Sequence, residues 1–157
     1  MLLKTWRSGG LLLSLAIPGY ASAALGEAPF TPGASAAVDA RVSVYKPTQS
    51  AQGFRVAGLE LNNGTGVLEF VDSKGRVFAL RWSGPDLPDM GMLLGPYLPV
   101  FKASVQAARQ AGKRGGPVAV QSAGLVLLST GAMGAFQGYA YLEALVPPGL
   151  DIQALLN

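Results

Sequence analysis

Four carboxylates are placed where they could carry out acid–base chemistry. Glu60 and Glu69 are predicted on one face of a sheet near Arg81, and paired carboxylates of this kind hydrolyse glycosides. Asp86 and Asp89 lie in a proline- and glycine-rich loop, where they could bind a hard cation or form an acid–base pair. A cross-strand ion pair and helix capping explain the same residues without catalysis. The four are therefore alternative acid/base candidates, and no metal site is predicted.

The chain contains neither histidine nor cysteine. This excludes histidine-dependent triads, the commonest metal ligand and disulfides. Ser83, Ser122 and Ser129 could be nucleophiles, but no GxSxG motif surrounds them. We therefore expect no catalytic residue and no cofactor, and the sequence favours a protein that is not an enzyme without settling the question.

Several aromatic residues could line a groove for a ligand or peptide. The candidates for such a groove are Trp82, Tyr97, Tyr139 and Tyr141. Pockets lined by aromatic side chains are typical of binding sites. Packing in the core or at its edge explains the same residues, and both interpretations stay open.

The N-terminus has the layout of a secretory signal. Lys4 and Arg7 precede a short apolar run over residues 9–17, Pro18 breaks it, and Ala21-Ser22-Ala23 supplies small residues for cleavage before Ala24. The run is too short for a spanning helix, which needs about 20 apolar residues. We expect signal peptide 1–23 to be removed and the protein to be periplasmic or secreted. The remaining chain is nearly neutral, so no nucleic-acid partner is expected.

Residues 24–40 are predicted to be a loose N-terminal segment, and residues 41–157 a single domain. A first strand is predicted over residues 41–45. Turns at Asn63-Gly64 and at residues 72–75 then predict a three-stranded antiparallel meander. A two-residue turn at Asn63-Gly64 pairs Leu59 with Leu68, and a bulged turn at Gly75 pairs Phe70 with Phe78. Both pairings put one set of bulky residues on a common face: Leu59, Leu61, Leu68, Phe70, Phe78, Leu80 and Trp82.

A helical stripe follows, capped by Asp86 or Asp89 and broken near Gly95-Pro96. Residues 115–142 carry no charge, which permits a membrane helix, but recurring glycines favour two or three short strands over residues 117–121, 125–128 and 136–142. The predicted fold class is α+β. It comprises an antiparallel sheet of a three-stranded meander, a crossover helix and a second set of two or three strands, with the helix packed on one face.

Short motifs that carry a family resemblance are spread along most of the chain: Ala23-Ala24-Leu25-Gly26, Asn63-Gly64-Thr65, Glu69-Phe70-Val71-Asp72, Gly75-Arg76-Val77-Phe78-Ala79, Trp82-Ser83-Gly84-Pro85, Pro88-Asp89, Leu93-Leu94-Gly95, Tyr97 and Ala135-Phe136-Gln137-Gly138. With them the sequence resembles the family called domain of unknown function 2844, small exported proteins of Gram-negative bacteria. The resemblance implies export but no activity, so it assigns no catalytic residue. Pro96 and Pro99 depart from the uninterrupted helix that the family leads us to expect.

Two hypotheses about function follow. The favoured one is a non-enzymatic binding or assembly module of the cell envelope, whose partner is an unknown envelope protein or peptide. It predicts a groove lined by aromatic residues or a sheet edge that accepts a strand. Under this hypothesis, the protein has no stable membrane span after the signal peptide is cleaved. The alternative is a small carboxylate-dependent envelope hydrolase using Glu60, Glu69, Asp86 or Asp89.

Overall fold

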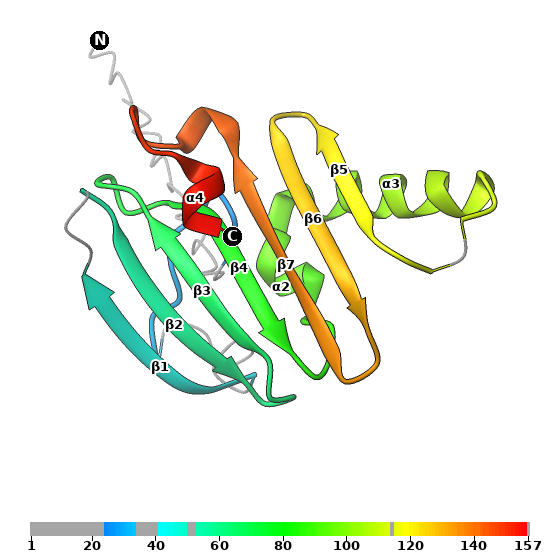
Figure 1. Cartoon of the computed structure of the whole chain (residues 1–157). Helices are drawn as coiled ribbons and strands as arrows, with labels where there is room; N and C mark the ends of the chain where they lie inside the picture. Colours follow the sequence, from blue (N-terminus) through cyan, green and yellow to red (C-terminus); the bar gives the residue numbers. More distant parts are fainter. Residues whose placement is uncertain (1–23, 34–40, 50–52, 114, 157) are drawn as a thin grey trace, which may run out of the picture.

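One antiparallel sheet of seven strands forms the centre of the protein (Figure 1). The computed structural model describes residues 24–33, 41–49, 53–113 and 115–156, so the predicted signal peptide lies outside the described residues. The strands are β1 (Val42–Gln49), β2 (Arg55–Leu61), β3 (Gly66–Val71), β4 (Val77–Gly84), β5 (Val118–Ser122), β6 (Leu125–Ala132) and β7 (Ala135–Leu142). Their spatial order is β1-β2-β3-β4-β7-β6-β5.

This architecture corrects the predicted fold class, although helices beside an antiparallel sheet remain compatible with α+β. The three-stranded meander with a crossover helix is wrong, because β1 pairs along the whole of β2 and makes the meander four-stranded. Pro47 lies within β1, and an edge strand tolerates proline because one side of its backbone has no partner. The chain then crosses to β5 at the far edge and returns through β6 and β7 to β4, so the fold is mostly sheet.

The predicted pairing of β2 with β3 is wrong by one residue. Leu59 lies opposite Val67 instead of Leu68. The turn has three loop residues, since the Gly64 amide donates to the Leu61 carbonyl at 2.9 Å and the Leu61 amide donates to the Thr65 carbonyl at 2.9 Å. Gly64 has a φ of 81°, which glycine adopts without strain. A shift of one residue turns every following side chain to the opposite face.

The second turn has the predicted form, but a β-bulge follows it. The Gly75 amide donates to the Asp72 carbonyl at 3.0 Å, and the register shifts between Phe70 and Val71. Phe70 therefore pairs with Ala79 instead of Phe78. A bulge adds one residue to one strand and leaves it unpaired, and here that residue is Phe78. Because of this bulge and the first turn, the predicted single apolar face is wrong.

The sheet has a buried cluster on each face. The face covered by the helices that follow β4 in the chain is here called the inner face. It carries Leu59, Leu61, Val67, Val71, Val77, Leu80 and Trp82. The opposite face, called the outer face, carries a smaller cluster around Phe54, Phe70 and Phe78. Leu80 and Phe70, predicted to share a face, therefore belong to different clusters.

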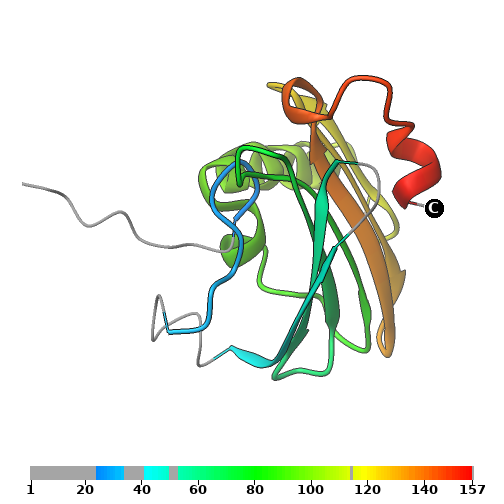
Figure 2. The ribbon, with the colours of Figure 1, turned by 90° about the vertical axis from the view of Figure 1, so that its left-hand side faces the viewer.

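The inner face is covered by helices and by the N-terminal segment (Figure 2). Helix α2 (Met90–Leu94) leads through the 3₁₀ helix η1 (Gly95–Tyr97) into α3 (Leu98–Gln110). The break falls at Gly95, as predicted, and Pro99 lies in the first turn of α3, where no helical hydrogen bond is lost. Leu25 and Phe30 are buried in the same cluster, so the N-terminal segment supplies two large side chains to the core.

Among the described residues, the outer face is covered only at the end where the C-terminal elements lie. The 3₁₀ helix η2 (Glu143–Leu145) and helix α4 (Ile152–Leu156) follow β7. Leu156 belongs to the same buried cluster as Phe54, Phe70, Phe78 and Tyr141. The uncharged segment forms β5, β6 and β7, as the short-strand prediction stated. Within the described residues, no helix is long and apolar enough to span a membrane.

Candidate binding surface on the outer sheet face

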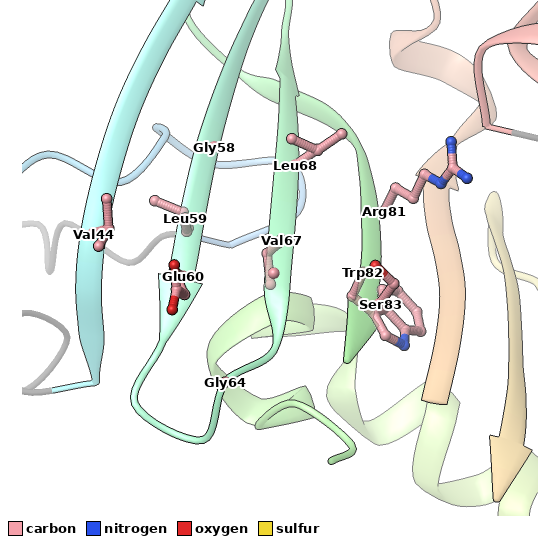
Figure 3. A pocket seen from close by; sticks show the side chains of 11 residues that line it. Val44, Gly58, Leu59, Glu60, Gly64, Val67, Leu68, Arg81, Trp82 and Ser83 are labelled. Atoms are coloured by element: carbon pink, nitrogen blue, oxygen red, sulfur yellow. The ribbon is translucent and has the colours of Figure 1, made fainter. Parts of the chain in front are cut away.

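The part of the outer face that α4 leaves open contains a shallow groove (Figure 3). Strand pairing places Val44, Glu60, Gly66 and Ser83 in one row across β1, β2, β3 and β4. The next row, nearer α4, contains Gly58, Leu68, Arg81 and Tyr139. Between these rows lies a hollow of about 470 Å³. Four neighbouring strands therefore supply its floor and walls.

Small and apolar residues make the floor of this groove. Gly58 and Gly66 supply no side chain, so the backbone of β2 and β3 is accessible there. Val44 is 38% exposed and Leu68 is 40% exposed, which makes them two of the few large apolar residues that face solvent. A glycine inside a strand weakens it and often marks a place where a ligand or another backbone approaches closely. The floor is thus shaped for apolar contact.

Two charged side chains, Glu60 and Arg81, border the apolar floor. They come from β2 and β4 with β3 between them, and both are exposed. The ion pairs within the described residues join Arg41 to Asp89 and Arg76 to Asp72, so neither Glu60 nor Arg81 makes one. An exposed charge without a partner remains available to a ligand.

A second, more polar hollow of about 250 Å³ adjoins the first. It shares Arg81 and Ser83 with the groove and adds Thr130, Gln137 and Tyr139 from β6 and β7. Hydroxyl and amide groups dominate this side, whereas Val44 and Leu68 dominate the other. Arg81 lies where the two meet, so the surface has an apolar half, a polar half and a cation between them.

The four aromatic candidates do not share one groove. Trp82 is buried on the inner face, and its indole lies against Gly138. Tyr97 is also on the inner side, beside Gly26. Tyr139 and Tyr141 stack on the outer face with ring centroids 6.3 Å apart, but α4 covers Tyr141, whose hydroxyl accepts from Gln153 at 3.3 Å. Of the four, Tyr139 alone has its side chain on the open surface.

The four carboxylates are also separated. Glu60 faces the open groove, whereas Glu69 is buried on the inner face, so the prediction that they share a face is wrong. Asp89 caps α2, accepting from the Gly91 amide at 2.8 Å, and also pairs with Arg41. Asp86 is exposed in the loop before α2. Of the four, the groove contains Glu60 alone, and a hollow beside Arg41 contains Asp89 alone. Among the described residues, no group of three or more acidic side chains could hold a metal ion.

Glu69 has an unusual environment. It is fully buried, and its Oε2 accepts from the Phe30 amide at 3.0 Å. Its Oε1 has no hydrogen-bond partner among the described residues. Burial raises the pKa of Glu69 to about 7, and the hydrogen bond from Phe30 opposes this only in part. The carboxyl therefore lies under residues 24–30, closed off from solvent.

Sequence reasoning missed most of the groove. Leu68 was predicted in the core because the pairing of β2 with β3 was set one residue off, and Val44 had no expected partner strand. A usable signal was nevertheless present: Gly58 and Gly66 interrupt two adjacent strands and pack no side chain of their own. Two glycines within one hairpin indicate an accessible backbone.

Comparison with known proteins gives one match. A family model described as protein of unknown function (DUF2844) matches residues 21–155. No curated protein and no solved structure matches. The match covers nearly the whole chain, including every strand of the sheet.

Proposed function

Because this chain belongs to the DUF2844 family, to which no activity is assigned, we propose a function from its surface: it is an exported, non-enzymatic binding module of the cell envelope. The observation that carries the proposal is the open half of the outer face, where apolar residues and an unpaired arginine surround an accessible backbone. The occupant we propose is an extended peptide segment of an envelope protein. Its apolar side chains would cover Val44 and Leu68, and an acidic group would pair with Arg81.

The chemistry of the groove supports a peptide over a small rigid ligand. The groove crosses several strands and changes from apolar to polar along its length, which suits a chain with varied side chains. It is open and shallow, whereas sites for small molecules usually enclose most of the ligand. The separated carboxylates give no support to the carboxylate-dependent hydrolase, so that alternative is not proposed.

Export is supported by the N-terminal sequence and by where packing begins. Residues 1–23 have the order of a secretory signal, and Ala24 and Leu25, which follow the predicted cleavage site, are buried in the domain. Mass spectrometry of the protein from fractionated cells tests this step. We expect a first residue of Ala24 in the periplasmic or secreted fraction. An intact Met1 in the cytosolic fraction would contradict export.

Binding is tested by placing a photo-crosslinking amino acid at position 68 of the full chain in producing cells. The matched control position is Ser73, which is exposed in the turn between β3 and β4. We expect position 68 to give a defined adduct with an envelope protein and position 73 to give none. Arg81→Glu should abolish the adduct, whereas Arg55→Glu, at an exposed arginine of β2 outside the groove, should preserve it. Equal adducts from positions 68 and 73 would contradict the proposal.

A further inference from the structure

The two edges of the sheet differ in how they are protected. The edge strand β1 contains Lys46 and Pro47 and has a register irregularity between Val42 and Val44. Charge, proline and bulges are among the devices that keep an edge from pairing with another strand. The other edge, β5, has none of them: its sequence is Val-Ala-Val-Gln-Ser, and its pairing with β6 is regular. Among the described residues, the β1 edge is therefore protected in these three ways, whereas β5 has a backbone edge that no strand pairs with.

Helix α3 extends past this open edge. It packs mainly against β5 among the strands, and its C-terminal half extends beyond that strand (Figure 1). A helix of 13 residues is about 20 Å long, whereas neighbouring strands are about 4.8 Å apart. The helix is thus long enough to cover a further strand placed beside β5.

The side of α3 that faces the sheet layer continues its apolar stripe into the overhang. Phe101 packs on the core cluster, and Val105 and Ala108 follow at helical spacing on the same side. Both are only half-buried, because α3 has already passed the last strand. An added strand would cover them, in the same way that β5 covers the first turns of the helix.

Helix α3 and the residues just after it carry positive charge only. Lys102 and Arg109 lie on α3, Lys113 follows it, and residues 90–142 include no aspartate or glutamate. All three are exposed, and none of them takes part in the ion pairs of the described residues. A second copy of this chain would bring basic groups against basic groups, which is unfavourable. An acidic partner would be attracted instead.

We propose that the free edge of β5 and the overhanging half of α3 together dock an extended, acidic segment of another polypeptide. The segment pairs with β5 as an eighth strand and points every second side chain toward α3. Of these side chains, apolar ones lie against Val105 and Ala108, and an acidic one at the end of the row reaches Arg109 and Lys113. Strand addition of this kind takes its affinity from main-chain hydrogen bonds and its specificity from alternate side chains. This site is separate from the outer groove and does not depend on it.

The test uses the full chain in producing cells with a photo-crosslinking amino acid at position 121, which is exposed on β5. We expect an adduct whose attached segment, identified by mass spectrometry, has apolar residues at every second position and continues the same alternation with an aspartate or glutamate. The double variant Arg109→Glu with Lys113→Glu should lose this adduct. The matched control Lys74→Glu makes the same kind of change in the distant turn between β3 and β4 and should keep it.

Three results would overturn the proposal. An adduct with a second copy of this chain would show that the edge serves self-association. An adduct that persists in the variant with Arg109→Glu and Lys113→Glu would show that the partner is not held by acidic side chains. The absence of any adduct at position 121, while position 68 gives one, would show that β5 is not a docking edge. Loss of the adduct at position 68 alone concerns the groove and leaves the edge proposal intact.

Discussion

Replacing the buried carboxyl of Glu69 by an amide should make the protein more stable at neutral and alkaline pH. In the folded state the carboxyl is fully buried and accepts one hydrogen bond, from the Phe30 amide. Its second oxygen has no partner among the described residues. Ionising the carboxyl there therefore costs more free energy than ionising the solvated carboxyl in the unfolded chain. Glutamine keeps the shape and the acceptor for Phe30 but cannot ionise.

The size of the effect follows from the pKa. Burial raises the pKa of Glu69 from 4.5 to about 7, and one pKa unit corresponds to about 1.4 kcal/mol. The folded state holds the proton more tightly than the unfolded state, so this contribution is fully present below pH 4.5 and is lost as pH rises through about 7. The loss is about 3 kcal/mol. Glu69→Gln should recover most of it at about pH 8 and little at about pH 4.

The assay is urea unfolding of the wild type and of Glu69→Gln across this pH range. Other groups titrate as well: burial alone would raise the pKa of Asp72, but hydrogen bonds from Arg76 and from the Lys74 amide lower it. Since Asp72 is present in both proteins, the difference between their unfolding free energies cancels its contribution. Glu60→Gln, at an exposed carboxyl, is the matched control and should show no such pH-dependent gain.

A stabilisation that does not change between about pH 4 and about pH 8 would refute the reasoning, because only ionisation of the buried carboxyl makes the effect depend on pH. Destabilisation by glutamine throughout the range would refute it too. That result would mean that the amide group of glutamine, placed where Oε1 has no partner, costs more than the buried charge does.

Three further substitutions test the packing. Gly138→Ala should lower the unfolding free energy by about 2 kcal/mol, because a Cβ would overlap the Trp82 indole and the neighbouring backbone; an unchanged urea midpoint would contradict that contact. Ala123→Asn should raise stability by about 1 kcal/mol, since Ala123 has a φ of 52° in the turn between β5 and β6 and asparagine tolerates this region better; thermal unfolding checks it, and a lower midpoint would count against it. Leu25→Ala should cost about 3 kcal/mol, because Leu25 is fully buried; a small loss in urea unfolding would mean that the N-terminal segment is not part of the core.

Turn residues and charge patterns indicated much of the local structure. The glycine-interrupted, uncharged segment forms β5, β6 and β7, and the turn between Asp72 and Gly75 closes with the expected hydrogen bond. The helical stripe breaks at Gly95, where φ is 48°. These features depend on a few neighbouring residues, so the sequence carries them directly.

Pairing between strands was harder to predict, because two turns suit the same residues. Asn62, Asn63 and Gly64 permit both a two-residue turn and a three-residue turn that ends in a left-handed glycine. The second form occurs. The bulge at Phe78 leaves no comparable mark in the sequence, because a phenylalanine beside Ala79 fits a regular strand equally well. Both the turn and the bulge depend on contacts between residues far apart in the sequence, because packing decides which side chains reach the cluster on each face of the sheet.

A single residue of pairing accounts for the two most distinctive features of the protein. Had the two-residue turn formed, Leu68 would face the core and Glu69 would face solvent, leaving neither an apolar groove nor a buried carboxyl. The three-residue turn reverses both: Leu68 becomes 40% exposed beside Arg81, and Glu69 becomes fully buried below Phe30. Burying a carboxyl lowers the stability of the fold, and an exposed leucine does not contribute the stabilisation that its burial would give. This protein has both the exposed Leu68 and the buried Glu69, so its open outer surface comes with a loss of folding stability. Such a loss is expected when a surface is used for binding.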